Sequence, residues 1–89
     1  MILKILIKND RVVIQLYNEK QIIDEISFPE AKNMSEKLLP SIDKILRKNN
    51  ISIKSIKQIY LESQMAESFT SYRIAKATTD SLNYLISCG

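Results

Sequence analysis

The first 29 residues contain three short apolar segments separated by turn signals. The segments that read as strands, being rich in Ile, Leu and Val, are residues 1–9, 11–17 and 21–28. Asn9-Asp10 separates the first two, and Asn18-Glu19-Lys20 separates the second and third. Connections this short join neighbouring strands in antiparallel order, and Pro29 marks the exit because it cannot donate to a ladder. The chain is therefore predicted to begin with an antiparallel meander of three strands.

An amphipathic helix is predicted to follow this meander. Asn33 is a candidate N-cap, and Glu36 three residues later completes a capping-box pattern. The apolar residues that recur at helical spacing are Met34, Leu38, Leu39, Ile42, Ile45 and Leu46. Pro40 lies inside this pattern, so we expect a kink or an irregular first turn there.

A fourth strand and a second helix complete the pattern. Residues 51–58 form a connector with room for one helical turn, and residues 58–61 read as a brief strand. The second helix is predicted over residues 70–86. Its apolar stripe contains Ile74, Ala75, Thr78, Leu82 and Leu85.

The order β-β-β-α-β-α predicts an α/β fold with a mixed sheet in a single domain, residues 1–89. A helix separates the first and fourth strands, so they should pair in parallel through a right-handed crossover, with both helices on one face. This arrangement resembles the first part of a ribonuclease-H-like, or actin-like ATPase, subdomain. The full subdomain continues with a fifth strand, so we expect a truncated unit whose fourth strand is an exposed edge.

Composition excludes several classes of function. The chain has no His, which excludes catalysis and metal ligation by histidine, and its single Cys88 cannot form an internal disulfide. That cysteine usage fits a reducing, cytoplasmic setting. No segment approaches the roughly 20 apolar residues of a membrane span. There is no phosphate-cradling glycine loop and no paired-carboxylate motif, so we expect no catalytic residue, no metal and no cofactor, and a protein that is not an enzyme.

Two stretches resemble the TsaB (YeaZ) family. Residues 33–43, Asn-Met-Ser-Glu-Lys-Leu-Leu-Pro-Ser-Ile-Asp, are similar to the first helix of that family, where Ser-Glu-x-Leu-Leu-Pro-x-Ile is typical. Further along, Ser68-Phe69-Thr70-Ser71-Tyr72-Arg73-Ile74-Ala75 resembles the family's Gly-Pro-Gly-Ser-Phe-Thr-Gly-x-Arg-Ile-Gly. The two motifs occur in the family's order and with matching spacing. The resemblance covers nearly the whole chain but only the N-terminal half of a TsaB.

The resemblance implies a role in making threonylcarbamoyladenosine in tRNA. In that family TsaB is a non-catalytic subunit that pairs with its paralogue TsaD through the two N-terminal helices of each partner. TsaE, an ATPase, joins the pair in bacteria. The implied function is therefore that of a scaffold subunit with a TsaD-like partner, and with tRNA contacted only indirectly.

The second motif departs from the family where a tight turn would need glycine. Met65-Ala66-Glu67 stands in place of Gly-Pro-Gly, and Ser71 and Ala75 replace later glycines. Glycine permits positive φ and close backbone approach, which these residues do not. In addition, Ile7-Lys8-Asn9-Asp10 places no acidic residue directly after the first strand. The residues of the motif that are retained are those that begin a helix and pack it in place, namely Ser68, Phe69, Thr70, Arg73 and Ile74. This pattern favours a scaffold over an active site.

The helix pair is therefore the predicted partner-binding surface. The residues assigned to it are Leu38, Leu39, Ile42, Tyr72, Arg73, Ala75, Lys76 and Thr79. Two alternatives stay open. The leucines and Ile42 would equally complete a core that faces the sheet, and Arg73 would equally form a structural ion pair with Glu62 or Glu67.

A basic cluster offers a further alternative. It consists of Lys44, Arg47, Lys48, Lys54 and Lys57, in a chain whose 13 Lys and Arg against 10 Asp and Glu give a net charge of +3. These residues either contact RNA or form a solvated rim that favours the C-terminal end of a helix dipole. The two alternatives to a TsaD-binding scaffold are thus a homodimeric interaction module outside that pathway and a small RNA-binding accessory protein.

Overall fold

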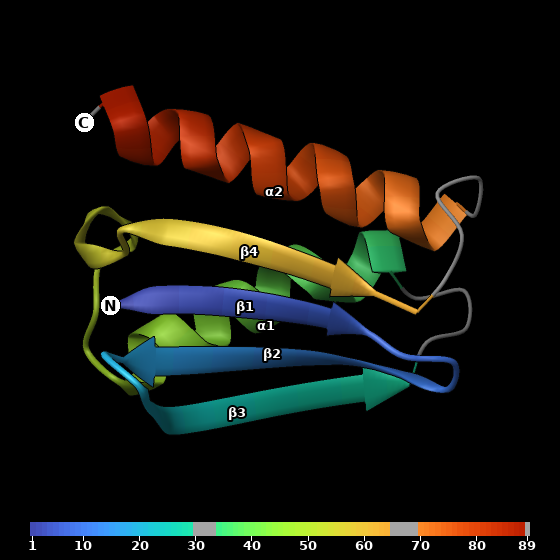
Figure 1. The fold of residues 1–89 in the computed structure, drawn as a ribbon, viewed down its shortest axis with the longest axis horizontal. Coiled ribbons are helices and arrows are strands. Elements are labelled where there is room, and N and C mark those ends of the chain that lie inside the picture. Colours follow the sequence, from blue (N-terminus) through green and yellow to red (C-terminus); the bar gives the residue numbers. More distant parts are fainter. Residues whose placement is uncertain (30–33, 65–69, 89) are drawn as a thin grey trace.

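A computed structural model describes residues 1–29, 34–64 and 70–88. Figure 1 shows a four-stranded sheet accompanied by two long helices. The elements in chain order are β1 (Ile2–Ile7), β2 (Arg11–Asn18), β3 (Gln21–Pro29), α1 (Met34–Lys48), the 3-10 turn η1 (Ile53–Ser55), β4 (Gln58–Ser63) and α2 (Thr70–Cys88). This order confirms the predicted β-β-β-α-β-α pattern, including a single helical turn within the 51–58 connector.

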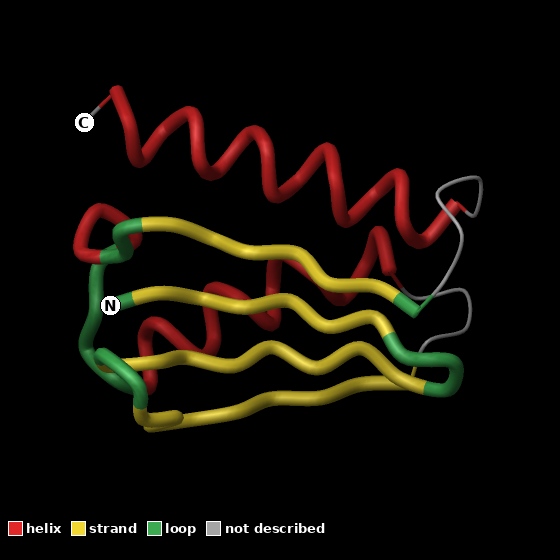
Figure 2. The backbone as a smooth tube through the Cα atoms, viewed as in Figure 1, coloured by secondary structure: helices red, strands yellow, loops and turns green. Residues whose placement is uncertain are grey.

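The first three strands form the expected antiparallel meander. β1 pairs with β2 from Ile2↔Tyr17 to Ile7↔Val12, and the Lys8 N–H donates to the Arg11 C=O at 2.8 Å where the chain turns. The second turn, at Glu19-Lys20, follows the pair Asn18↔Gln21, and Glu19 adopts a positive φ of 58°. Figure 2 shows these two turns at opposite ends of the sheet, as successive tight hairpins require.

β4 joins the other side of β1 in parallel, which completes the strand order β3-β2-β1-β4. A parallel neighbour needs a crossover connection, and α1 supplies it. α1 packs against β2 and β3, α2 packs against β4, and the helices also contact each other. Residues of both helices belong to the same core on one face of a mixed sheet, as the sequence predicts. Figure 1 shows α1 crossing behind the strands and α2 running alongside β4.

The core lies between this face of the sheet and the helices. Because successive side chains of a strand point to opposite faces, alternate residues of β1 and β2 reach it. The fully buried residues of β1 and β2 that form it are Leu3, Ile5, Ile7, Val12, Ile14 and Leu16, and Ile59 joins them from β4. From the helices, Leu38, Ile45 and Ala75 are buried against them. Removing this much apolar surface from water is the main term that favours the folded chain.

α1 continues through Pro40, which lies inside the helix rather than at its first turn. The ring nitrogen carries no hydrogen, so the bond that a helix would form to the C=O of Glu36 is lost. The other end of α1 is closed by a Schellman motif. There the Ile51 N–H donates to the Leu46 C=O at 2.9 Å, and Asn50, with φ of 56°, donates to the Arg47 C=O at 3.1 Å.

Several predicted boundaries move by one or two residues. β3 includes Pro29 as its last residue, where an edge strand tolerates a missing donor, while β4 extends to Ser63 and α2 extends to Cys88. The candidate cap Asn33 lies outside the described residues. Neither α1 nor α2, as far as the structure describes them, combines the length and apolarity needed to cross a membrane.

The opposite face of the sheet carries a row of polar contacts. The Gln15 amide donates to Glu25 at 2.8 Å, and the Tyr17 hydroxyl donates to Gln15 at 3.0 Å. Lys4 lies 3.5 Å from a Glu62 carboxylate oxygen, and its ammonium lies 5.4 Å from the centre of the Tyr17 ring. These contacts link all four strands on the face that neither described helix covers.

Candidate partner-binding surface

α2 presents two apolar stripes to different surroundings. One faces the sheet and contains the buried Ala75 and Thr79, with Leu82 and Ile86 packed against the core beside them. The other repeats at spacings of three and four residues, through Ala77, Ser81, Tyr84 and Leu85. Tyr84 is 68% exposed and Leu85 55% exposed. A single core requires only the first stripe, so the second is available for another molecule.

α1 contributes one large apolar side chain next to that second stripe. Leu39 is 53% exposed, although its neighbour Leu38 is fully buried. Leu39 lines a hollow of about 260 Å³ between the helices, together with Ala77, Thr78, Ser81 and Leu82. A second shallow depression continues along α2 and is lined by Asp80, Ser81, Tyr84 and Leu85. We call Leu39, Ala77, Ser81, Tyr84 and Leu85 the outer helix surface.

Charged residues border the outer helix surface. Lys76 and Asp80 form an ion pair across one turn of α2, with oxygen–nitrogen distances of 2.8 and 3.0 Å. Asp43 and Arg47 form another on α1, at 2.9 Å. An apolar centre bordered by polar groups is the usual anatomy of a protein–protein contact. The small Ala77 and Ser81 would admit a bulky side chain from a partner.

Half of the residues predicted to bind a partner lie inside the fold. Leu38, Ile42, Ala75 and Thr79 are buried between the helices and the sheet, which for the first two is the alternative role as core residues. Leu39, Arg73 and Lys76 are exposed, and Tyr72 is half-buried. While the chain holds this conformation, a partner would reach the second group and not the first.

Sequence reasoning missed Ala77, Ser81, Tyr84 and Leu85 as a surface. The available signal was a second set of apolar and small residues at helical spacing beside the sheet-facing stripe. The predicted core stripe includes Leu85, but this residue lies too far around the helix to be covered and is 55% exposed. Arg73 does not use Glu62, which pairs with Lys4, and its other candidate partner Glu67 lies outside the described residues.

The predicted RNA-binding cluster lies at one end of the sheet, where α1 ends and η1 and β4 begin (Figure 1). Arg47 is engaged with Asp43, and Lys48 lies 3.5 Å from Asp24. Lys44, Lys54 and Lys57 are exposed. Two of the five cations are therefore partly neutralised by carboxylates, which weakens the field that a phosphate backbone would experience.

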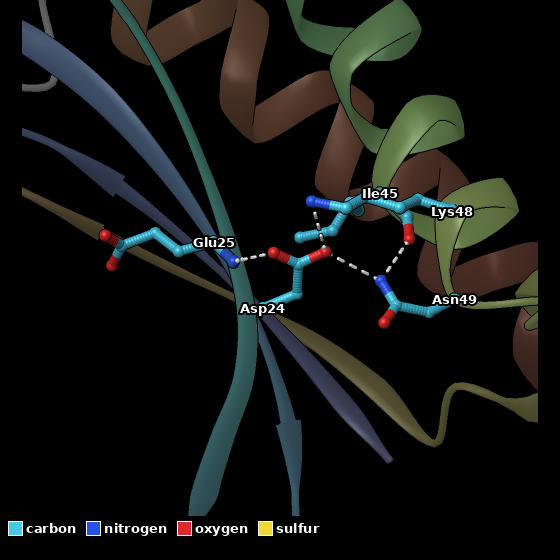
Figure 3. Close-up of polar contacts among 5 residues, drawn as sticks. All are labelled: Asp24, Glu25, Ile45, Lys48 and Asn49. Carbon is cyan, nitrogen blue, oxygen red and sulfur yellow. Dashed lines mark hydrogen bonds and ion pairs between the residues drawn. The ribbon is translucent and has the colours of Figure 1, made fainter.

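Asp24 anchors the end of α1 to β3. Figure 3 shows its carboxylate between the two elements, accepting from the Asn49 amide at 2.9 Å and from the Glu25 backbone N–H at 2.8 Å. These hydrogen bonds, with that of Asn49 foremost and Lys48 assisting, lower the pKa of Asp24 below its usual value of 3.8. The cluster is a structural anchor, since all its members are occupied with one another. Across the described residues, no three acidic or thiol side chains gather as a metal site would require.

Known structures share this architecture. YeaZ from Pseudomonas aeruginosa superposes with a TM-score of 0.82 at 16% sequence identity, over 97% of this chain and 39% of that chain. The fold is that of the N-terminal region of YeaZ. An uncharacterized protein with similarity to peptidase YeaZ from Pseudomonas aeruginosa matches with a TM-score of 0.75 at 18% identity, again over 97% of this chain and 39% of that one. No family model and no curated protein matches the sequence.

The YeaZ-like fold confirms the resemblance inferred from the two motifs, and it does so at the level of architecture. Residues 34–43 of the first motif lie in α1, including Pro40, and residues 70–75 of the second motif begin α2. Residues 65–69, which hold the substituted glycine turn, lie outside the described part. The chain spans about two fifths of the YeaZ-like structures that it matches, 39% of each.

Proposed function

We propose that the chain is a non-catalytic, TsaB-like scaffold subunit that binds a TsaD-like partner through its helix pair. It would act in the cytoplasm in threonylcarbamoyladenosine modification of tRNA, with TsaE as a further component and with tRNA reached only through the complex. The fold likeness to YeaZ and the two sequence motifs support the family relationship. The observation that carries the binding proposal is the outer helix surface, with three large apolar side chains left exposed by the core.

The contact is expected at the exposed residues of the helix pair. Leu39 and Leu85 would be the anchors, because an apolar side chain that is half exposed in the free subunit has area left to bury. Arg73 and Lys76, already predicted to bind the partner, lie exposed on the same helix and would contribute to the polar rim. Leu38, Ile42, Ala75 and Thr79 would instead act from within, by holding the helices at the angle that forms the surface.

Co-purification with the TsaD-like subunit of the same cell tests this proposal. The wild-type chain should retain the partner at micromolar concentrations, and Leu39→Glu should release it. Ile22→Glu is a matched control, because Ile22 is 50% exposed but lies on β3, away from α2. Absence of a complex with the wild-type chain, or equal loss with both variants, would contradict the proposal.

A homodimer is the second candidate, favoured by the same exposed apolar surface. A second copy would bury Leu39, Tyr84 and Leu85 just as a paralogue would. Sedimentation separates the two candidates, since a dimer that forms alone and ignores the TsaD-like subunit supports the homodimer. The RNA-binding alternative is less favoured because Arg47 and Lys48 are engaged with carboxylates. It predicts tRNA binding with a steep salt dependence.

A further inference from the structure

The side chain of Asn83 on α2 pairs with both backbone groups of one β4 residue. Its Oδ1 accepts from the Ile59 N–H at 2.9 Å, and its Nδ2 donates to the Ile59 C=O at 2.9 Å. A carboxamide offers one donor direction and one acceptor oxygen in the same plane, as a peptide group does. Asn83 therefore occupies the place that a residue of a neighbouring strand would take beside Ile59.

β4 is an edge of the sheet, with β1 as its strand neighbour in the order β3-β2-β1-β4. An edge strand presents backbone donors and acceptors to any other strand that can reach them. Beside the Asn83–Ile59 pair lies an open groove of about 520 Å³, lined among others by Gln58, Tyr84 and Ser87. The edge that the sequence predicts to be exposed is thus covered by α2 (Figure 1), with an open groove beside the Asn83–Ile59 pair.

The two edges of the sheet differ in their other protection. On the β3 side, the register shifts between Leu16 and Tyr17, and the strand ends in Pro29. Bulges and proline are devices that prevent a further strand from pairing. β4 contains no proline, and it pairs with β1 in unbroken register from Gln58 to Ser63. Its apolar Ile59 and Leu61 make it a suitable template for strand pairing.

We propose that Asn83 fastens α2 over the β4 edge and so closes this edge against addition of the β4 strand of a second copy of the chain. An incoming strand must align with Ile59 to form a continuous ladder, and it can do so only by displacing these two hydrogen bonds and the part of α2 that packs against β4. The closure depends on the carboxamide. Leucine at position 83 keeps a similar size but provides neither bond, whereas aspartate keeps an acceptor for the N–H and places a negative charge against the C=O.

Amide exchange and sedimentation of Asn83→Leu test this proposal, in a Leu39→Glu background that removes association through the outer helix surface. Exchange of the Ile59 amide should accelerate roughly fivefold to tenfold at low concentration. Between low micromolar and several hundred micromolar, the variant should form a dimer in which the Ile59 amide is protected again. The Leu39→Glu single variant should remain monomeric, as should its combination with Ser87→Ala, since the Ser87 hydroxyl lines the same groove but donates to the Tyr84 C=O on its own helix.

Two results would overturn the proposal that Asn83 keeps the β4 edge closed. One is unchanged exchange at Ile59 in Asn83→Leu, and the other is faster exchange in a chain that stays monomeric at the highest concentration. If Asn83→Leu fails to fold, Asn83→Asp gives the same comparison with the side-chain volume retained. That variant loses the hydrogen bond to the Ile59 C=O and should associate as its concentration rises, and a chain that stays monomeric would equally contradict the proposal. Because every variant carries Leu39→Glu, the outcome is independent of partner binding by the helices.

Discussion

Asn49 fastens the C-terminal end of α1 to β3 by donating from Nδ2 to Asp24 at 2.9 Å and to the C=O of Ile45 at 2.7 Å (Figure 3). Asp24 accepts these contacts best when ionised, so its pKa is lowered in the folded chain. A carboxyl whose pKa is lowered by folding contributes stability above its unfolded pKa, near 3.8. That contribution is lost as the pH falls through the lowered folded value.

The first prediction follows from the loss of stability on acidification that the lowered pKa of Asp24 implies. For the wild-type chain, the urea concentration at the unfolding midpoint should decrease as the pH is lowered from about 5 to about 2.5, roughly the window in which an ion-paired carboxylate titrates. Asn49→Ala removes the largest cause of the lowered pKa, so its midpoint should be lower at pH 5 and should depend less on pH. Asp43→Asn serves as a control, because Asp43 pairs with Arg47 on the exposed side of α1. An Asn49→Ala variant with the full wild-type pH dependence would show that Asn49 does not set the Asp24 pKa.

The second prediction concerns Thr79, whose hydroxyl is buried at 5% exposure and forms no hydrogen bond within the described part of the chain. Valine has nearly the same shape and removes the unsatisfied oxygen. Thr79→Val should therefore raise the free energy of unfolding by about 1 kcal/mol, as measured by urea denaturation. Thr78→Val, at the neighbouring half-buried position, should change it less. A lower free energy of unfolding for Thr79→Val would contradict this prediction, because it would mean that the hydroxyl forms a stabilising hydrogen bond.

The third prediction uses Asn50, which closes α1 with a φ of 56°. Glycine adopts this left-handed region without the steric penalty of a side chain, and the penalty for asparagine is smaller than for most other residues. Asn50→Gly should hold or raise stability by up to about 1 kcal/mol, while Asn50→Ala should lower it. Asn18→Gly is the contrasting variant, because Asn18 lies in β2 and should lose stability. Thermal melts that rank Asn50→Ala above Asn50→Gly would contradict this account of the helix end.

Local patterns in the sequence carry most of the fold. Tight turns at Asn9-Asp10 and Glu19-Lys20 require antiparallel neighbours, and the helix between β1 and β4 requires a parallel pair. The apolar spacing around Pro40 continues in phase, which predicts that Pro40 lies inside a helix, and the structure confirms this. These features depend on residues close together in the chain, and so they can be read without knowing what packs where.

The surface was harder to predict because exposure depends on contacts between distant segments. Leu38 and Leu39 are adjacent and chemically identical, yet one is fully buried and the other is 53% exposed. The rotation of α1 about its own axis, which its packing against the sheet sets, decides which of them faces the sheet. Likewise, no local pattern predicts that Asn83 reaches Ile59, since that contact depends on how α2 lies along β4.

The central claim is that the outer helix surface binds a TsaD-like subunit, and a direct affinity measurement tests it most sharply. Titration calorimetry of the TsaD-like subunit with the wild-type chain, Leu39→Glu, Leu85→Glu and Ile22→Glu compares three exposed apolar positions. The account predicts that each helix variant weakens binding by at least about tenfold, as expected for the loss of an interface anchor, and that Ile22→Glu binds as the wild-type chain does. Wild-type affinity in both helix variants would contradict it.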